Sequence, residues 1–240
     1  MTPTERIVAA SGQMVVPEFA PPLYPDCQFT ALNSGSPEIE VCEFLYSLVR
    51  LIKPGYILET GTHYGISAAY MALAQQANAP KHGNLVTLEI DGRYAHDAQE
   101  LFRRLEVDKT TMCLLRPSLQ YDPGEFGETS KAPFIDLLFL DSEPGLRFNE
   151  FVKFFPWVTP GGFIMIHDLH PHLGHTNVTT TMDNGTTMFD WPYGDFRPTL
   201  GPYVKSHQVQ TITFPTPRGF TLFQKAAPSF GATNLLQGSI

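Results

Sequence analysis

Strand-like and helix-like segments alternate along the middle of this chain, and the alternation restricts the fold more than any other feature. Apolar runs of strand length occupy residues 56–59, 85–89, 112–115, 134–140 and 162–167. Segments with helical spacing lie between them, at residues 67–76, 95–105 and 146–155. Two more strand-like runs, 208–214 and 220–224, follow close together and predict an antiparallel hairpin. The pattern predicts an α/β fold, in which a mostly parallel seven-stranded sheet lies between two layers of helices.

Proline content and loss of periodicity divide the chain into segments. Residues 1–36 are predicted to form an N-terminal arm on the surface, because closely spaced prolines exclude a helix from its middle. The domain itself is assigned to residues 37–225, and Ser36 is expected to cap its first helix. Within it, residues 169–206 lack periodicity and are expected to form a lid insertion. Residues 226–240 are predicted to be a tail.

Composition argues against several classes of partner. The formal net charge is −8 and the 16 Lys and Arg residues are spread thinly, so no nucleic-acid partner is expected. No apolar run approaches the ~20 residues of a membrane helix, and the N-terminus lacks the features of a signal peptide. Cys27, Cys42 and Cys113 lack the spacing of a disulfide framework or a zinc site. We therefore expect no membrane partner, reduced thiols and a cytoplasmic location.

A glycine-containing turn between a strand and a helix lies in residues 57–67, which read Ile-Leu-Glu-Thr-Gly-Thr-His-Tyr-Gly-Ile-Ser. Gly61 and Gly65 would let a ligand approach the backbone, and the start of the helix offers N–H groups. A dinucleotide site would have the spacing G-x-G-x-x-G, but here His63 fills the place of the middle glycine. His63 and Glu59 disfavour a pyrophosphate and suit a ligand with a cationic amine. An ordinary tight turn is the alternative.

Three further acidic residues end predicted strands: Glu89, Asp141 and Asp168. The carboxyl ends of parallel strands meet at one edge of a sheet, where open α/β proteins bind their ligands. Glu89 can accept hydrogen bonds from both ribose hydroxyls of a nucleoside, although a solvated strand end is the alternative. Asp141 ends the most apolar strand of the chain. The sequence therefore predicts a binding site lined by acids at this edge.

Histidines are concentrated directly after the last parallel strand. His167, His170, His172 and His175 are four of the eight histidines of the chain. Such a cluster indicates metal binding or proton transfer, and a polar loop with exposed imidazoles is the alternative. We expect one or two of them to be functional, with His170 as a candidate base.

Together these motifs resemble the class I S-adenosylmethionine (SAM) dependent methyltransferases over about residues 37–225. Glu-Thr-Gly-Thr-His-Tyr-Gly is similar to the family pattern E-x-G-x-x-x-G, and the terminal hairpin is typical of the family. Within the class, the chain resembles the catechol O-methyltransferase-like group and the metal-dependent O-methyltransferases of sugars and antibiotics. The resemblance implies a Rossmann-like three-layer sandwich and SAM-dependent O-methylation of a small-molecule acceptor. A divalent metal, Mg²⁺ or Mn²⁺, would assist in the metal-dependent case.

The resemblance also implies roles for individual residues. The methionine part of SAM would be lined by the turn after the first strand, through Glu59, Gly61, Thr62, Gly65 and Ser67. Glu89 would hold the ribose, and Ser118 would contact the adenine. Asp141 and Asp168 match two acidic metal ligands of the family.

The predicted metal site departs from the family pattern. Catechol-type enzymes carry Asp-Asn where this chain has Asp168-Leu169, and the sugar and antibiotic enzymes place an acid where this chain has His167. A neutral imidazole can bind a divalent ion, so the predicted ligands are Asp141, His167 and Asp168. The predicted catalytic residues are His167, Asp168 and His170. Without a metal, Asp141 would bind the amine of SAM and Asp168 would cap the lid.

Two alternatives remain at this point. A metal-dependent hydrolase would use Asp141, Asp168 and the histidines, but it leaves Glu59 and Glu89 without a role. A non-catalytic SAM-binding protein of the same fold has the same sequence features as an enzyme. The sequence identifies neither the acceptor nor whether the chain forms a homo-oligomer.

Overall fold

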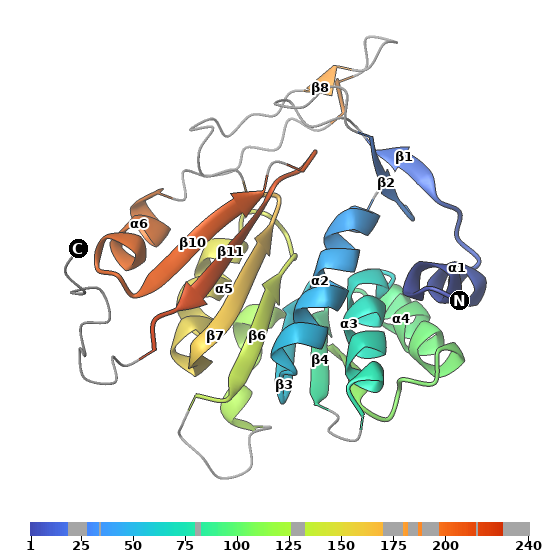
Figure 1. The fold of residues 1–240 in the computed structure, drawn as a ribbon, viewed down its shortest axis with the longest axis horizontal. Coiled ribbons are helices and arrows are strands. Elements are labelled where there is room, and N and C mark those ends of the chain that lie inside the picture. The colour runs from blue at the N-terminus through green and yellow to red at the C-terminus, as the bar shows by residue number, and fades with distance from the viewer. Residues whose placement is uncertain are drawn as a thin grey trace, which may run out of the picture.

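A seven-stranded sheet forms the centre of the fold in the computed structural model (Figure 1). The structure describes residues 1–18, 28–33, 35–79, 83–125, 133–169, 180–181, 187–188, 197–214 and 216–227. The strands of the sheet run in the order β10-β11-β7-β6-β3-β4-β5. Their bounds are β3 Tyr56–Thr60, β4 Asn84–Glu89, β5 Thr111–Leu115, β6 Ile135–Leu140, β7 Val158–His167, β10 Val209–Phe214 and β11 Phe220–Lys225.

Strand directions match the sequence prediction. Strands β3 to β7 pair in parallel, and β11 runs antiparallel to both β7 and β10. The predicted mostly parallel α/β sheet with an antiparallel C-terminal hairpin is therefore confirmed. The strand order reverses between β3 and β6, because β4 and β5 extend the sheet on one side and β7 extends it on the other. Ligands of open α/β sheets bind at such a switch point.

Helices cover both faces of the sheet. The helices are α1 Pro3–Ser11, α2 Ile39–Ile52, α3 Ile66–Ala77, α4 Gly92–Arg104, α5 Arg147–Phe154 and α6 Arg197–Lys205. One apolar cluster packs the helices α1, α2, α3 and α4 against one face of the sheet. A second cluster packs α5 and α6 against the other face. Successive residues of β6 alternate between them: Leu137 and Phe139 belong to the first, Leu138 and Leu140 to the second. Strand β6 is apolar apart from Asp136 near its start, because both of its faces are buried.

Short elements complete the described fold. Single 3₁₀ turns lie at η1 Ser118–Gln120, η2 Pro123–Glu125 and η3 Phe155–Trp157. Strand β1 Val16–Glu18 pairs with β2 Phe29–Ala31, and β8 Thr180–Thr181 pairs with β9 Thr187–Met188. Among the helices described, none combines the length and the hydropathy needed to cross a bilayer.

The N-terminal segment differs from the predicted surface arm. Helix α1 begins with a capping box formed by Thr2 and Glu5. Ile7 is fully buried in the same cluster as α3 and α4, and the Tyr70 hydroxyl of α3 donates a hydrogen bond to Thr4. The helix is thus part of the domain. The sequence carried this capping signal, but the prolines further along dominated the prediction.

The start of α2 and the lid region also differ from expectation. Glu38, not Ser36, precedes the first turn of α2, and it makes no side-chain cap; the Ser36 hydroxyl bonds to Asn33 instead. Helix α6 lies in a region expected to be irregular, and its proline and glycine residues hide its helical pattern. Most of the predicted lid, including His170, lies outside the described residues. The tail from residue 228 onward does so too.

Candidate active site

The turn after β3 packs directly against the end of β6. The Asp141 amide donates to the Thr60 carbonyl at 3.0 Å, which holds the two chain segments together. Gly61 has φ +83°, and a Cβ there would lie 2.2 Å from the Asp141 carbonyl oxygen. Gly65 has φ +76°, and a Cβ there would lie 2.9 Å from the Cβ of Ala98 on α4. Both glycines are needed for close packing, and their predicted contact with a ligand stays a prediction.

Glu59 is a buried carboxylate with an unused oxygen. Its Oε1 accepts a 2.5 Å hydrogen bond from the Ser67 hydroxyl, whereas its Oε2 is buried and has no partner among the described residues. Burial raises the pKa of Glu59 to about 8, although the hydroxyls of Ser67 and Thr87 oppose this shift. An unsatisfied buried acceptor is costly, so this oxygen is a place for a donor or a cation.

Glu89 and Thr62 are fixed by the same turn. The two Glu89 oxygens accept backbone N–H groups from His63 at 2.7 Å, Ile90 at 2.8 Å and Asp91 at 3.0 Å. A carboxylate has about four acceptor positions, so one remains for a ligand hydroxyl in this arrangement. The Thr62 hydroxyl lies 2.6 Å from the hydroxyl of Thr87 and is buried, which makes it a support of the turn.

Ser118 is joined to a buried carboxylate that the sequence did not single out. Glu150 of α5 is fully buried and accepts hydrogen bonds from the hydroxyls of Ser118, Thr60 and Ser142. These residues follow or end β5, β3 and β6, so Glu150 ties three strand ends together. The Ser118 hydroxyl proton is used in this contact, and a contact of Ser118 with adenine remains a prediction.

Asp141, His167 and Asp168 come together as predicted. One ligand atom of each lies within 4.8 Å of the others, a grouping that can hold a metal ion. His167 Nδ1 lies 3.0 Å from Asp141 Oδ1 and 3.4 Å from Asp168 Oδ1. Asp168 has φ +55°, which turns its side chain back toward this cluster after β7 ends. This turn explains how two adjacent residues enter one site.

The second ring nitrogen of His167 also contacts a carboxylate. Its Nε2 lies 2.7 Å from Glu38 Oε2, and the other Glu38 oxygen accepts the Arg218 amide at 3.0 Å. Burial alone would lower the pKa of His167, but the carboxylates of Asp168, Asp141 and Glu38 raise it to about 10. With a carboxylate against each ring nitrogen, the imidazolium is the stable form at neutral pH.

Arg147 links the two aspartates. Its Nη2 donates to Asp141 Oδ1 at 3.1 Å and its Nη1 to Asp168 Oδ2 at 2.6 Å. The same side chain donates to the carbonyls of Ser142 at 2.8 Å and His167 at 2.5 Å. Although burial would raise it, the pKa of Asp168 is lowered to about 2 by His167, Arg147 and Arg218. Arg147, Arg218 and the imidazolium of His167 therefore compensate a group of three carboxylates.

The site thus contains three residues that the sequence analysis missed. Glu38 lies at the start of the predicted first helix, where an acid is common, and Glu150 has no distinctive sequence signal. Arg147 has one, because it lies in the first turn of α5, where the helix dipole disfavours a cation. An arginine at that position, six residues after Asp141, indicates a local carboxylate partner.

Comparison with known proteins finds similarity to methyltransferases. Residues 58–169, which contain all of this geometry except Glu38 and Arg218, match a family profile described as a methyltransferase domain. A catechol O-methyltransferase from Niastella koreensis is 31% identical over 140 residues, covering 55% of this chain and 59% of that protein. These two matches support the resemblance to the class I SAM-dependent methyltransferases.

Two further proteins of related description are similar to this chain. The catechol O-methyltransferase domain-containing protein 1 of Mus musculus is 28% identical over 127 residues, or 53% of this chain and 47% of that protein. The chain thus spans about half the length of the curated relatives it matches. The O-methyltransferase TomG from Streptomyces achromogenes, solved with SAM, superposes with a TM-score of 0.61 at 21% identity. The superposition covers 80% of this chain and 82% of the TomG chain, and it supports the fold.

The residues of this methyltransferase domain fit SAM. The unpartnered Glu59 Oε2 offers a buried acceptor for a cationic amine. Glu89 lies on the neighbouring strand, and its backbone contacts hold its carboxylate in place. The assignment of the SAM amine to Glu59 and of the ribose to Glu89 stays a prediction.

The same test gives a different result for a divalent metal. The three predicted ligands are close enough, but a permanent cation already lies between the two aspartates. Arg147 donates to Asp141 Oδ1 and Asp168 Oδ2, and each ring nitrogen of His167 faces a carboxylate. A divalent ion would therefore have to compete with Arg147 for the aspartates and displace the proton of His167. The predicted roles of His167 as base and ligand stay predictions. His170, the other predicted base, lies outside the described residues.

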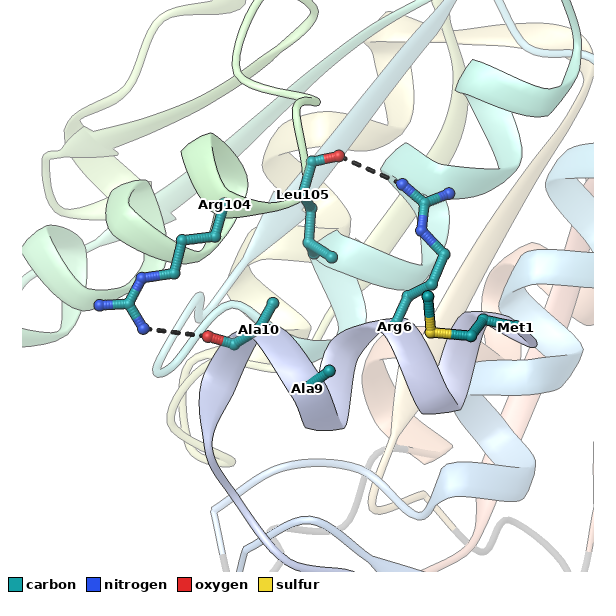
Figure 2. A pocket seen from close by; sticks show the side chains of 6 residues that line it. All are labelled: Met1, Arg6, Ala9, Ala10, Arg104 and Leu105. Carbon is teal, nitrogen blue, oxygen red and sulfur yellow. Dashed lines mark hydrogen bonds between the residues drawn. The ribbon is translucent and has the colours of Figure 1, made fainter.

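A cavity of about 430 Å³ lies elsewhere, between α1 and the end of α4 (Figure 2). Its two arginines already donate to backbone carbonyls, Arg6 to Leu105 at 3.3 Å and Arg104 to Ala10 at 3.0 Å. Helices α3 and α4 return antiparallel to the strands that they connect, so their carboxyl ends lie away from the carboxyl ends of the strands. This cavity is therefore separate from the candidate site.

Proposed function

We propose that this chain transfers the methyl group of SAM to a hydroxyl oxygen of a small-molecule acceptor. The observation that carries the proposal is Glu59, a buried carboxylate with one unpartnered oxygen at the carboxyl end of the strand beside the switch point. Glu89 supports it as a second fixed carboxylate one strand away. A hydrolase acting through Asp141 and Asp168 would give neither of these two carboxylates a role.

The chain's own residues would bind and orient the reactants. Glu59 would hold the amine of the methionine part, and Glu89 would hold a ribose hydroxyl. When bound, SAM supplies an electrophilic methyl group on a sulfonium. Alignment of the acceptor oxygen with that methyl group is the main requirement of such a transfer. The acceptor proton would pass to a base, for which His170 remains the candidate.

Titration calorimetry with SAM tests the first step directly. We expect binding, and we expect Glu59→Gln to weaken it by roughly tenfold or more, because the variant loses a charge-assisted contact. Leu51→Ala serves as the control, since Leu51 is 80% exposed on α2. Equal SAM affinity of Glu59→Gln and the parent would contradict the assignment of Glu59.

The transfer step is tested with methyl-labelled SAM and a panel of catechols and hydroxylated small molecules. Label that is recovered on the oxygen of any acceptor, with formation of S-adenosylhomocysteine, supports the proposal. SAM binding without transfer to any member of the panel would favour a binding protein of the same fold. Hydrolysis of an ester or phosphate substrate without SAM would favour the hydrolase.

A further inference from the structure

An arginine lies between the two aspartates that the family resemblance assigns to a metal. The guanidinium of Arg147 contacts Asp141 at 3.1 Å and Asp168 at 2.6 Å. All three side chains are largely buried, with exposed fractions of 6%, 9% and 12%. Because guanidinium stays protonated throughout the range in which proteins fold, this cation is permanent.

The backbone fixes Arg147 in this place. Its Nε donates to the Ser142 carbonyl and its Nη1 to the His167 carbonyl, at the ends of β6 and β7. The residue begins α5, where the helix dipole opposes a positive charge. The carboxylates of Asp141 and Asp168 account for a cation at this otherwise unfavourable position.

A divalent ion at this place would have to share the two aspartates with Arg147. Coordination through Asp141 Oδ1 or Asp168 Oδ2 would remove that oxygen from the guanidinium. Coordination through any oxygen of the pair would place a second, doubly charged cation beside a buried arginine. Both consequences are unfavourable in a site that is largely closed to water. Magnesium additionally requires near-ideal octahedral geometry from oxygen ligands, and one oxygen of each aspartate is already oriented toward Arg147.

We propose that Arg147 takes the place of a divalent metal in this chain, so that the aspartate pair is compensated by an internal guanidinium. The inference rests on the proposed function and deepens it, because it predicts methyl transfer without a metal cofactor. Arg147 acts as a positioning residue: it holds Asp141 and Asp168 and contributes a fixed positive charge beside the acceptor region.

The decisive experiment measures Mn²⁺ binding, by electron paramagnetic resonance of free ion, without any substrate. The parent protein should show no stoichiometric binding at micromolar Mn²⁺. Arg147→Gln should gain a site, with affinity at least tenfold above the parent, because the variant releases both aspartates. Arg147→Lys keeps the charge and should resemble the parent. Arg103→Gln, at an exposed ion pair on α4, is the matched control and should also resemble the parent.

Stoichiometric micromolar binding of Mn²⁺ by the parent, abolished by Asp141→Asn, would overturn the inference. If Arg147→Gln fails to fold, as circular dichroism would reveal, the parent and Arg147→Lys measurements decide the question. A folded Arg147→Gln variant that gains no Mn²⁺ site would also contradict the inference.

Activity in chelator separates this inference from the proposed function. Methyl transfer by metal-free protein in excess EDTA should equal transfer with added Mg²⁺ or Mn²⁺. If SAM binds but transfer stops in EDTA and returns with the ion, the inference is wrong while the proposed function stands. If SAM does not bind at all, the proposed function fails, whatever the Mn²⁺ titration shows.

Discussion

At the scale of single residues, the proposed contact of Glu59 with the SAM amine predicts that SAM binding depends on a proton. The pKa of Glu59 of about 8 means that the free protein holds Glu59 mostly protonated at pH 7. A cationic amine favours the carboxylate, so binding should release up to about one proton per site at pH 7. Calorimetry in buffers with different ionisation enthalpies measures this number. Glu59→Gln should release none, and the exposed variant Glu106→Gln should behave as the parent. Proton release that persists in Glu59→Gln would show that another group is responsible.

His167 should make the fold less stable as the pH becomes alkaline. Its folded pKa of about 10 lies above the ordinary value of 6.5, so the folded state binds the proton more tightly. The stabilisation is complete below pH 6.5 and is lost as the pH rises toward 10, with a slope of up to about 1.4 kcal/mol per pH unit. Denaturant unfolding from pH 6.5 to 9 checks this trend.

A variant isolates the contribution of His167 from that of other groups. Loss of the Glu59 proton also lowers the stability of the fold as the pH rises to about 8. The comparison of the parent with His167→Gln above that pH is therefore the informative one. The free energy of unfolding of that variant should change less between pH 8 and 9 than that of the parent. His96→Gln, on an exposed position of α4, should follow the parent. Parallel pH profiles for the parent and His167→Gln would mean that His167 is neutral in the folded state.

The residues of the site were predictable from sequence to different degrees. Glu59, Asp141 and Asp168 end strands, and the parallel sheet brings strand ends to one edge whatever the details of packing. Glu38 and Arg147 reach the same edge from the first turns of helices. Where a helix begins relative to that edge depends on tertiary packing, which periodicity does not define. The protonated state of His167 was missed because Glu38 was missed.

At the scale of elements, the turn from β3 to α3 depends on Gly61 for steric reasons. A Cβ at Gly61 would meet the Asp141 carbonyl at 2.2 Å, whereas one at Gly12 would meet nothing within 4 Å, and both residues have positive φ. Gly12→Ala should therefore cost about 1–2 kcal/mol, from backbone strain alone. Gly61→Ala should cost about 1–3 kcal/mol more, because the chain segments must move apart. Denaturant unfolding compares the two, and equal costs would contradict the steric explanation.

The elements themselves were predicted well where their apolar pattern is strong. The seven strands of the sheet and helices α3, α4 and α5 were located within a few residues, because each has a buried stripe or a buried face. Helix α1 is short and was concealed by the closely spaced prolines that follow it in the chain. Helix α6 contains Pro202 and was concealed for the same reason.

At the scale of the whole molecule, one sheet separates two apolar cores. Leu45 of α2 lies in one cluster and Phe154 of α5 in the other, and both are fully buried. Leu45→Ala should cost about 2–5 kcal/mol and Phe154→Ala about 3–5 kcal/mol. Because the residues share no cluster, the double variant should lose the sum within about 0.5 kcal/mol. The control Leu51→Ala should cost little, since Leu51 is exposed.

Chemical denaturation of the four variants measures these free energies. A double variant that loses much less or much more than the sum would indicate that the sheet transmits packing changes between its two faces. Two separate unfolding transitions would indicate that the cores melt independently, which a shared sheet makes unfavourable.

The bond between Glu38 and His167 joins residues 129 positions apart, and the Arg218 amide reaches Glu38 across 180. On the ribosome, Glu38 is therefore made long before either of its partners emerges. Helix α2 can form early. Glu38, directly before it, finds its partners only after the last parallel strand and then the turn before β11 have been made. A polypeptide released before that turn lacks the donor that orients Glu38 and, through it, the histidine beside Asp141. The cluster around His167 therefore assembles only after the chain has been made as far as β11, and a shorter polypeptide lacks it.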